Sequence, residues 1–187
     1  MSGETLDAVA AAFKGLARGD MQGLDVIWRE LSRPLHNYAF ALTGSHDDAD
    51  DILGDCLVRL AKRGWRLRLV RDPKSYLFTA VRNAARDRGR RSRDVPDAET
   101  LAPVADHAEA VAIRQAVLAL PVDQREAVAL HIWGGLTCNE IGRTLGVSQN
   151  TAASRYRYAI KKLRDVLGDE FDETRRPREQ AEVNAAE

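Results

Sequence analysis

A stretch of polar side chains near the C-terminal end of the chain combines the groups that read and hold nucleic acids. Amides can read adenine, arginine can read guanine or hold a phosphate, and the free N–H groups of a helix N-terminus can hold a phosphate. The residues expected on or near the outward face of this helix are Ser148, Gln149, Asn150, Thr151, Ala153, Ser154, Arg155, Arg157, Tyr158 and Lys161. The pattern indicates a helix that reads duplex DNA, and an ordinary helical hairpin with a solvated basic face is the alternative.

The charges of the chain are segregated along the sequence although they cancel overall, with 28 Lys and Arg against 28 Asp and Glu in 187 residues. Residues 59–93 contain 13 basic and 2 acidic side chains, and residues 125–167 contain 7 basic and 3 acidic ones. The segments between and around them are acidic. Two basic segments could therefore meet a polyanion, but blocks of like charge are also common on solvated faces.

A cluster of carboxylates at 47–51 (DDADD) precedes an apolar helical pattern, where acidic side chains favour a helix N-terminus. Such a cluster could also bind the metal ions of a nuclease, but no His or second carboxylate cluster completes a two-metal site. The two cysteines, Cys56 and Cys138, have no partner at metal-ligand spacing and are expected to be small buried residues. The sequence thus predicts no disulfide, metal or other cofactor.

Helical periodicity dominates the elements that must position these groups, and no alternating strand pattern is found. Pro34 is expected to kink or split the second helix, whereas Asp72 and Pro73 are typical of a helix start. Helical patterns cover residues 6–17, 27–42, 47–63, 73–90, 111–120, 123–133, 138–145 and 149–167.

The last two helices have the signals of a helix-turn-helix. Thr137 and Glu140 stand at the spacing of a capping box, Gly146 supplies a turn, and Ser148 can cap the following helix. The second helix of such a motif can enter the major groove of DNA, which is about 12 Å wide.

Between the two halves, the segment 93–108 contains Pro96, Pro103 and several acids but little that could form a core. We therefore predict an all-α protein with two small helical domains, residues 1–92 and 109–167, joined by a flexible linker at 93–108. The C-terminal domain is the helix-turn-helix, and the acidic tail at 168–187 is expected to be disordered.

The run ALPVDQREAVALHIWGGLTCNEIGRTLGVSQNTAASRYRYAIKKLR resembles region four of the extracytoplasmic-function (ECF) sigma factors of bacterial RNA polymerase, which belong to the sigma-70 family. The matching positions include Leu120-Pro121, Arg125-Glu126, Glu140-Ile141 and Ser154-Arg155. Ala152 and Ala153 replace the usual Val and Lys, so the bases that are read can differ from those of other members.

The N-terminal half resembles region two of the same family, through LTGSHDDADDILGDCLVRLAKR and DPKSYLFTAVRNAARDRGRR with the loop RGWRLRLVR between them. The commonly seen Gln-Glu-Thr-Phe reads Gly54-Asp55-Cys56-Leu57 here. A glycine inside a helix costs about 1 kcal/mol relative to Ala, and either close approach of a partner or sequence drift would account for it.

The resemblance implies two sets of site residues in this half. Those that would dock on the largest subunit of the polymerase are Asp48, Asp51, Leu53 and Asp55. Those that would recognise and open the minus-ten promoter element are Trp65, Leu67, Arg68, Arg71, Lys74, Arg82, Asn83, Arg86 and Arg90. Strand opening requires a platform for unstacked bases together with cations on the backbone. Trp65 taken alone is better interpreted as a core residue.

The resemblance implies a sigma factor without catalytic activity. Region two (1–92) would bind core RNA polymerase and open DNA, and region four (109–167) would read the minus-thirty-five element. Promoter DNA and core polymerase are the expected partners, an anti-sigma factor is a further one, and no small-molecule substrate is expected. A transcription regulator that uses the helix-turn-helix alone, with the N-terminal half for dimerisation or sensing, is the alternative. The acidic N-terminus and the lack of a long apolar run predict a cytoplasmic protein with no membrane insertion.

Overall fold

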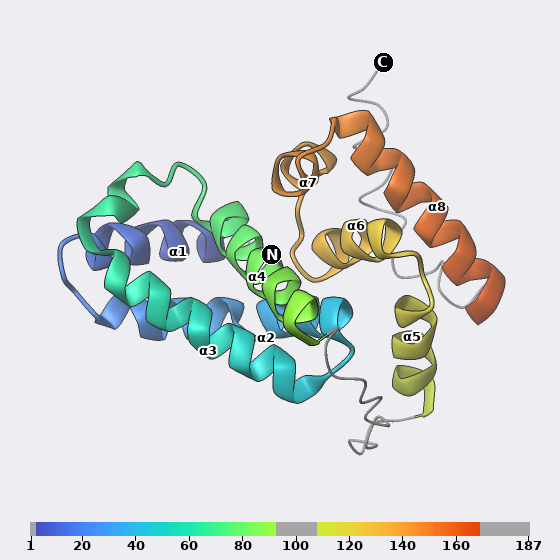
Figure 1. The fold of residues 1–187 in the computed structure, drawn as a ribbon. Coiled ribbons are helices and arrows are strands. Elements are labelled where there is room, and N and C mark those ends of the chain that lie inside the picture. The colour runs from blue at the N-terminus through green and yellow to red at the C-terminus, as the bar shows by residue number, and fades with distance from the viewer. Residues whose placement is uncertain (1–2, 93–107, 169–187) are drawn as a thin grey trace.

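The computed structural model describes residues 3–92 and 108–168, and every regular element in these ranges is a helix (Figure 1). The first group comprises α1 (Gly3–Leu16), α2 (Gln22–Thr43), α3 (His46–Arg63), the 3₁₀ helix η1 (Gly64–Leu69) and α4 (Pro73–Ser92). The second comprises α5 (Ala108–Leu118), α6 (Val122–Ile132), α7 (Cys138–Leu145) and α8 (Gln149–Leu167). The predicted all-α, two-domain fold is confirmed, whereas the linker at 93–107 and the tail from 169 lie outside the described residues.

Short polar side chains cap the starts of α3 and α4, and the cap of α4 is the predicted one. Asp72 accepts a hydrogen bond from the Ser75 N–H at 3.0 Å at the start of α4. At α3 the cap is Ser45, whose hydroxyl accepts from the Asp48 N–H at 3.2 Å, so the carboxylates that follow supply charge and not the cap.

Helix α2 runs unbroken through Pro34, so of the two expected effects, a kink or a split, the split does not occur. Proline removes one backbone hydrogen bond and crowds the preceding turn. Leu31 and Leu35 flank it and are both fully buried, and packing of this face compensates for the lost bond.

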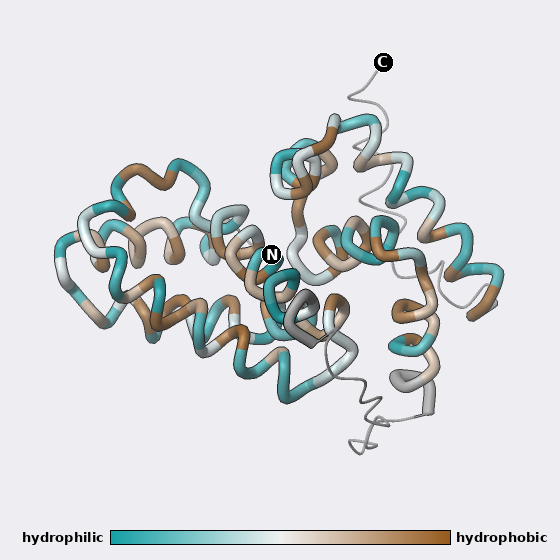
Figure 2. The backbone as a smooth tube through the Cα atoms, viewed as in Figure 1, coloured by the Kyte–Doolittle hydropathy of each residue, from teal (hydrophilic) through white to brown (hydrophobic). Residues whose placement is uncertain are grey.

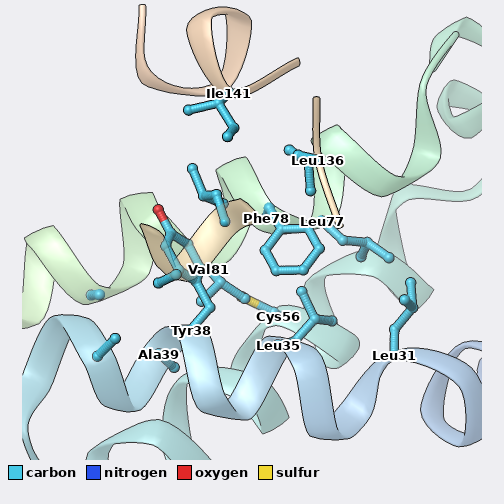
Figure 3. Packing of buried hydrophobic residues seen from close by; sticks show 14 of the residues in the cluster. Leu31, Leu35, Tyr38, Ala39, Cys56, Leu77, Phe78, Val81, Leu136 and Ile141 are labelled. Carbon is cyan, nitrogen blue, oxygen red and sulfur yellow. The ribbon is translucent and has the colours of Figure 1, made fainter. Parts of the chain in front are cut away.

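The apolar face of α2 forms the centre of the core (Figure 3). Tyr38 of α2 meets Phe78 of α4 edge to face, with ring centroids 5.5 Å apart. Leu136, from the segment between α6 and α7, lies beside Phe78 and Leu77 of α4, and Ile141 of α7 belongs to the same buried cluster (Figure 3). The hydrophobic core is therefore continuous between the two domains.

The hydropathy of the residues agrees with this packing, since hydrophobic and hydrophilic residues are interspersed along the helices (Figure 2). Within residues 3–92 and 108–168, no helix combines the length and the apolar character that crossing a membrane would require.

Candidate nucleic-acid interface

The turn between α7 and α8 is built by local contacts. The Thr137 hydroxyl accepts from the Glu140 N–H, and the Glu140 carboxylate accepts from the Thr137 N–H at 2.8 Å, which completes the predicted capping box. Gly146 follows with a φ of 73°, a conformation that favours glycine. Gly142 lets the next segment approach closely, because a Cβ there would lie 2.9 Å from the Val147 carbonyl oxygen.

Helix α8 presents its N-terminal end to solvent. The Ser148 hydroxyl accepts from the Thr151 N–H at 3.1 Å and so caps the helix. Gln149, Asn150 and Thr151 are all exposed. This exposed end of a helix-turn-helix has the groups and the geometry needed to enter a major groove.

The middle of α8 is held by side chains of α6. Arg155 donates to the Asp123 carboxylate at 2.7 Å, and it is half-buried. Tyr156 is buried and packs against His131, with ring centroids 4.4 Å apart. The other predicted residues of this surface divide into half-buried Ala153 and Ser154 and exposed Arg157, Tyr158 and Lys161.

The basic loop predicted before α4 is η1, and its apolar residues point in different directions. Trp65 is 65% exposed and Leu69 is also exposed, so the interpretation of Trp65 as a core residue is wrong. Leu67 is only 2% exposed and belongs to the core, which contradicts its predicted place on a base-binding surface. In a 3₁₀ helix, which has three residues per turn, side chains two positions apart point about 120° apart, so Leu67 does not share a face with Trp65 or Leu69.

A hollow of about 450 Å³ lies beside η1 and is lined by residues of both domains. Trp65, Tyr76 and Arg71 line it from the first domain, and Arg143 and Thr144 of α7 line it from the second. Aromatic rings and guanidinium groups together suit an unstacked base and its phosphates.

Cations lie over both aromatic rings of this hollow. The Arg63 guanidinium carbon is 5.4 Å from the centre of the Tyr76 ring, and that of Arg66 is 6.0 Å from the Trp65 ring. These positions are within the range of cation–π attraction.

The predicted DNA-opening residues of α4 fall into two groups. Asn83 and Arg86 are exposed, as are Arg68 and Arg71 before the helix. Lys74 and Arg82 are only 5% and 8% exposed, because the second domain covers them. The side chain of Arg90 lies outside the described residues.

The two buried cations of α4 both have partners in the second domain. The Lys74 ammonium group donates to the Gly135 carbonyl oxygen at 2.8 Å, and burial lowers the pKa of Lys74. Arg82 donates to both carboxylate oxygens of Glu126, at 2.8 and 3.0 Å. Burial opposes the charge of Arg82, but the hydrogen bonds and charge of Glu126 raise its pKa above the ordinary value.

The acidic surface of α3 differs from the prediction in one residue. Leu53 is buried in the core and is therefore not available as an exposed anchor. Asp48 and Asp51 both accept from Arg88 of α4, with the Asp51 contact at 2.9 Å, and Asp55 lies 4.0 Å from Arg59. Burial lowers the pKa of Arg88, but the two carboxylates outweigh it and raise that pKa above its ordinary value.

Gly54 lies among these acids on the exposed face of α3. A Cβ added to it would meet no atom within 4 Å, so nothing within the described residues requires glycine there.

Glu126 and Arg88 have roles at these surfaces that the sequence did not reveal. Both act on residues far away in the chain, and helical periodicity reports only neighbours within one element. The one available signal was an acid inside the otherwise apolar run EAVAL of α6, where a buried charge needs a partner.

Residues 3–92 and 108–168 contain no group of three or more His, Cys, Asp or Glu that could hold a metal ion. Cys56 is buried as predicted, and burial raises the pKa of its thiol to about 11. Cys138 is half-buried, which corrects its predicted place in the core.

Two family models match the chain in the same order as the two domains. Residues 27–95 match the model described as sigma-70 region 2, and residues 110–163 match the model described as sigma-70, region 4.

Curated relatives are similar to the chain over most of their length. The chain is 34% identical over 156 residues to the ECF RNA polymerase sigma factor SigM of Mycobacterium tuberculosis, covering 80% of each chain. It is 32% identical over 142 residues to the ECF RNA polymerase sigma factor EcfG of Rhodopseudomonas palustris, covering 71% of this chain and 78% of the relative.

Two solved structures share the fold. The sigma factor RpoE of Bartonella quintana, solved in complex with the anti-sigma factor NepR, superposes with a TM-score of 0.64 at 24% identity, covering 76% of this chain and 95% of that one. CnrH in complex with the cytosolic domain of CnrY gives a TM-score of 0.65 at 22% identity, covering 86% and 97%.

Proposed function

Because the chain belongs to the ECF sigma factors of bacterial RNA polymerase, we propose a division of promoter recognition between its two domains. A sigma factor binds core RNA polymerase, directs it to promoters and helps to open the DNA, and this is the function of the chain. The observation that carries this conclusion is 34% identity over 80% of a curated ECF sigma factor, with both sigma regions in order. The role requires no catalysis by the chain itself.

We propose that residues 109–167 read the upstream, minus-thirty-five element through α8. The exposed side chains of Gln149, Asn150 and Thr151 at the helix start supply amide and hydroxyl contacts to base edges. Arg157 and Lys161 are exposed further along and supply contacts to phosphates.

Residues 1–92 hold, in this proposal, the parts that capture the opened strand. The exposed ring of Trp65 and the hollow beside Tyr76 offer stacking surfaces to an unpaired base. Asn83 and Arg86 lie on the exposed part of the neighbouring helix α4, where they can contact the strand.

The carboxylates of α3 form the proposed docking surface for core polymerase. Asp48, Asp51 and Asp55 follow one another along the outer part of this helix, and the buried Leu53 supports the surface from below. Complementary charge sets the orientation and the rate of such an encounter. Because polymerase and chromosome share the cytoplasm, we place the action of the protein there.

An anti-sigma factor is a further proposed partner. RpoE of Bartonella quintana, which has a similar fold, was solved with its anti-sigma factor NepR.

Transcription with purified components tests the function. Core polymerase and a library of genomic fragments are combined with and without this protein, and the transcripts are sequenced to find its promoters. We expect transcripts that start at defined sites only when the protein is present. Absence of such transcripts, together with absence of a complex with core polymerase at low salt, would overturn the proposal. Footprinting without polymerase tests the alternative regulator, which should protect a palindrome by itself.

A further inference from the structure

The contact between Arg82 of α4 and Glu126 of α6 joins the two domains through a buried ion pair. Glu126 is 1% exposed, and it accepts two hydrogen bonds from Arg82. Arg86, one turn further along α4, places its guanidinium 3.7 Å from the same carboxylate. One acid of the second domain thus meets two cations of α4 that the resemblance to sigma region two places among the residues that recognise and open the minus-ten element.

Two further polar contacts join the same surfaces. Lys74 donates to the Gly135 carbonyl oxygen at 2.8 Å, and Arg125 donates to the Ala41 carbonyl oxygen at 3.2 Å. Leu136 adds an apolar contact, since it lies beside Phe78 and Leu77 of α4 in the shared core (Figure 3). We call the arrangement in which the two domains are in contact the closed form. It is held by these polar groups together with an apolar contact.

A carboxylate and a phosphate bind a guanidinium group in the same way, through two parallel N–H···O hydrogen bonds. Arg82 cannot contact a DNA phosphate in this arrangement, because the second domain buries it. A buried ion pair is also weak evidence for net stability, since both charges lose their hydration. Such a contact can hold two surfaces together and still be exchanged for another anion.

We propose that Glu126 substitutes for a DNA phosphate on α4 and holds the protein closed until strand capture begins. The inference rests on the proposed function of α4. Helix α8 is not covered in the closed form, since Gln149, Asn150 and Arg157 remain exposed. The contact consequently restricts the binding of single-stranded DNA by the first domain. It leaves the residues of α8 that would read duplex DNA accessible.

Linkage makes this restriction measurable in both directions. A strand that binds only the open form must favour separation of the domains, and separation of the domains must favour binding of the strand. The apparent affinity falls by the fraction of molecules that are open.

The test compares Glu126→Gln with Asp123→Asn. The two substitutions remove one carboxylate each from the same helix, but Asp123 pairs with Arg155 inside its own domain. Donor and acceptor dyes are attached at Val58→Cys and Val166→Cys, exposed positions on α3 and α8, in a Cys56→Ala, Cys138→Ala background. The ligands are a labelled single-stranded oligonucleotide of the non-template strand and an upstream promoter duplex, both taken from a promoter found by transcription.

We expect Glu126→Gln to lower energy transfer between the dyes and to bind the single strand roughly five- to tenfold more tightly. Its affinity for the duplex should stay within about twofold of the wild-type value. Asp123→Asn should leave energy transfer and single-strand affinity unchanged. Addition of the single strand to the wild-type protein should also lower energy transfer.

Equal energy transfer and equal single-strand affinity in Glu126→Gln and wild type would overturn the inference, even if the wild-type protein transcribes. Failure of the wild-type protein to transcribe would instead count against the proposed function, and the dye measurement would still decide whether the contact holds the domains. If Glu126→Gln does not fold, Arg125→Met removes the separate contact with Ala41 and should lower energy transfer in the same way.

Discussion

Asp123 of α6 holds the guanidinium group of Arg155 at 2.7 Å, so an acid outside the helix-turn-helix positions a residue within it that we predict to read DNA. The carboxylate is exposed, whereas Arg155 is half-buried along α6. A phosphate or guanine that binds Arg155 therefore meets a side chain whose direction is already set, which lowers the entropic cost of the contact.

We expect Arg155→Ala to weaken binding of the upstream promoter duplex by about 1–3 kcal/mol, because one guanidinium contact to DNA is lost. Fluorescence anisotropy with the labelled duplex measures this change. Binding to core polymerase should be unchanged, and an equal loss of both activities would contradict the division between the domains.

Charge reversal of Asp48 and Asp51 to Lys should weaken binding of core polymerase by about tenfold or more, since like charges then meet at the interface. The measurement is a titration of labelled protein with core polymerase at two salt concentrations. Arg88→Ala is the control: it removes the cation that pairs with both acids and leaves their charge in place. An equal loss in this variant would show that the ion pairs matter and the acidic surface does not.

Trp65→Ala and Leu67→Ala should separate DNA opening from stability, although the two residues are near neighbours in η1. Because Trp65 is exposed, Trp65→Ala should mainly slow strand opening, which is measured by the fluorescence of a 2-aminopurine base placed in the promoter. Because Leu67 is buried, Leu67→Ala should lower the free energy of unfolding by about 2–5 kcal/mol, which urea denaturation measures. Destabilisation by Trp65→Ala of similar size would contradict its place on the surface.

Tyr38→Phe should leave the protein as stable or increase its stability by about 1 kcal/mol, because the Tyr38 hydroxyl is buried without a hydrogen-bond partner in the described structure. Burial, followed by the charge of Glu126, raises the pKa of Tyr38 above its ordinary value. The folded state therefore keeps this proton longer than the unfolded state does, and the stability that it contributes is lost as the pH rises above the pKa of an unfolded tyrosine. Between neutral and strongly alkaline pH, the urea midpoint should therefore fall less for Tyr38→Phe than for the wild-type protein.

The features that could be predicted from the sequence are those set by residues close together in the chain. The capping box of Thr137 and Glu140, the Gly146 turn and the Ser148 cap depend on contacts within a few residues, so their spacing reveals them. The exposed start of α8 follows from the same local pattern.

The features that could not be predicted depend on which helices meet. Lys74 and Arg82 lie on the basic side of α4, as periodicity indicates, but α6 and the turn before α7 cover that side. Trp65 and Leu67 lie in environments opposite to those expected, because this segment forms a 3₁₀ helix in which side chains two residues apart point in different directions and Leu67 faces the core. Contacts between segments more than forty residues apart are set by the tertiary packing and not by the local pattern.

The bare surface at Gly54 has a consequence for how α3 can be approached. An alanine there would fit without displacing any described atom and would strengthen the helix by about 1 kcal/mol. With glycine at this position the helix is less stable than it would be with alanine, and a strip of main chain between acidic side chains stays uncovered. A bulky aliphatic side chain of a neighbouring protein could rest directly on that strip, at a distance that any side chain at this position would prevent.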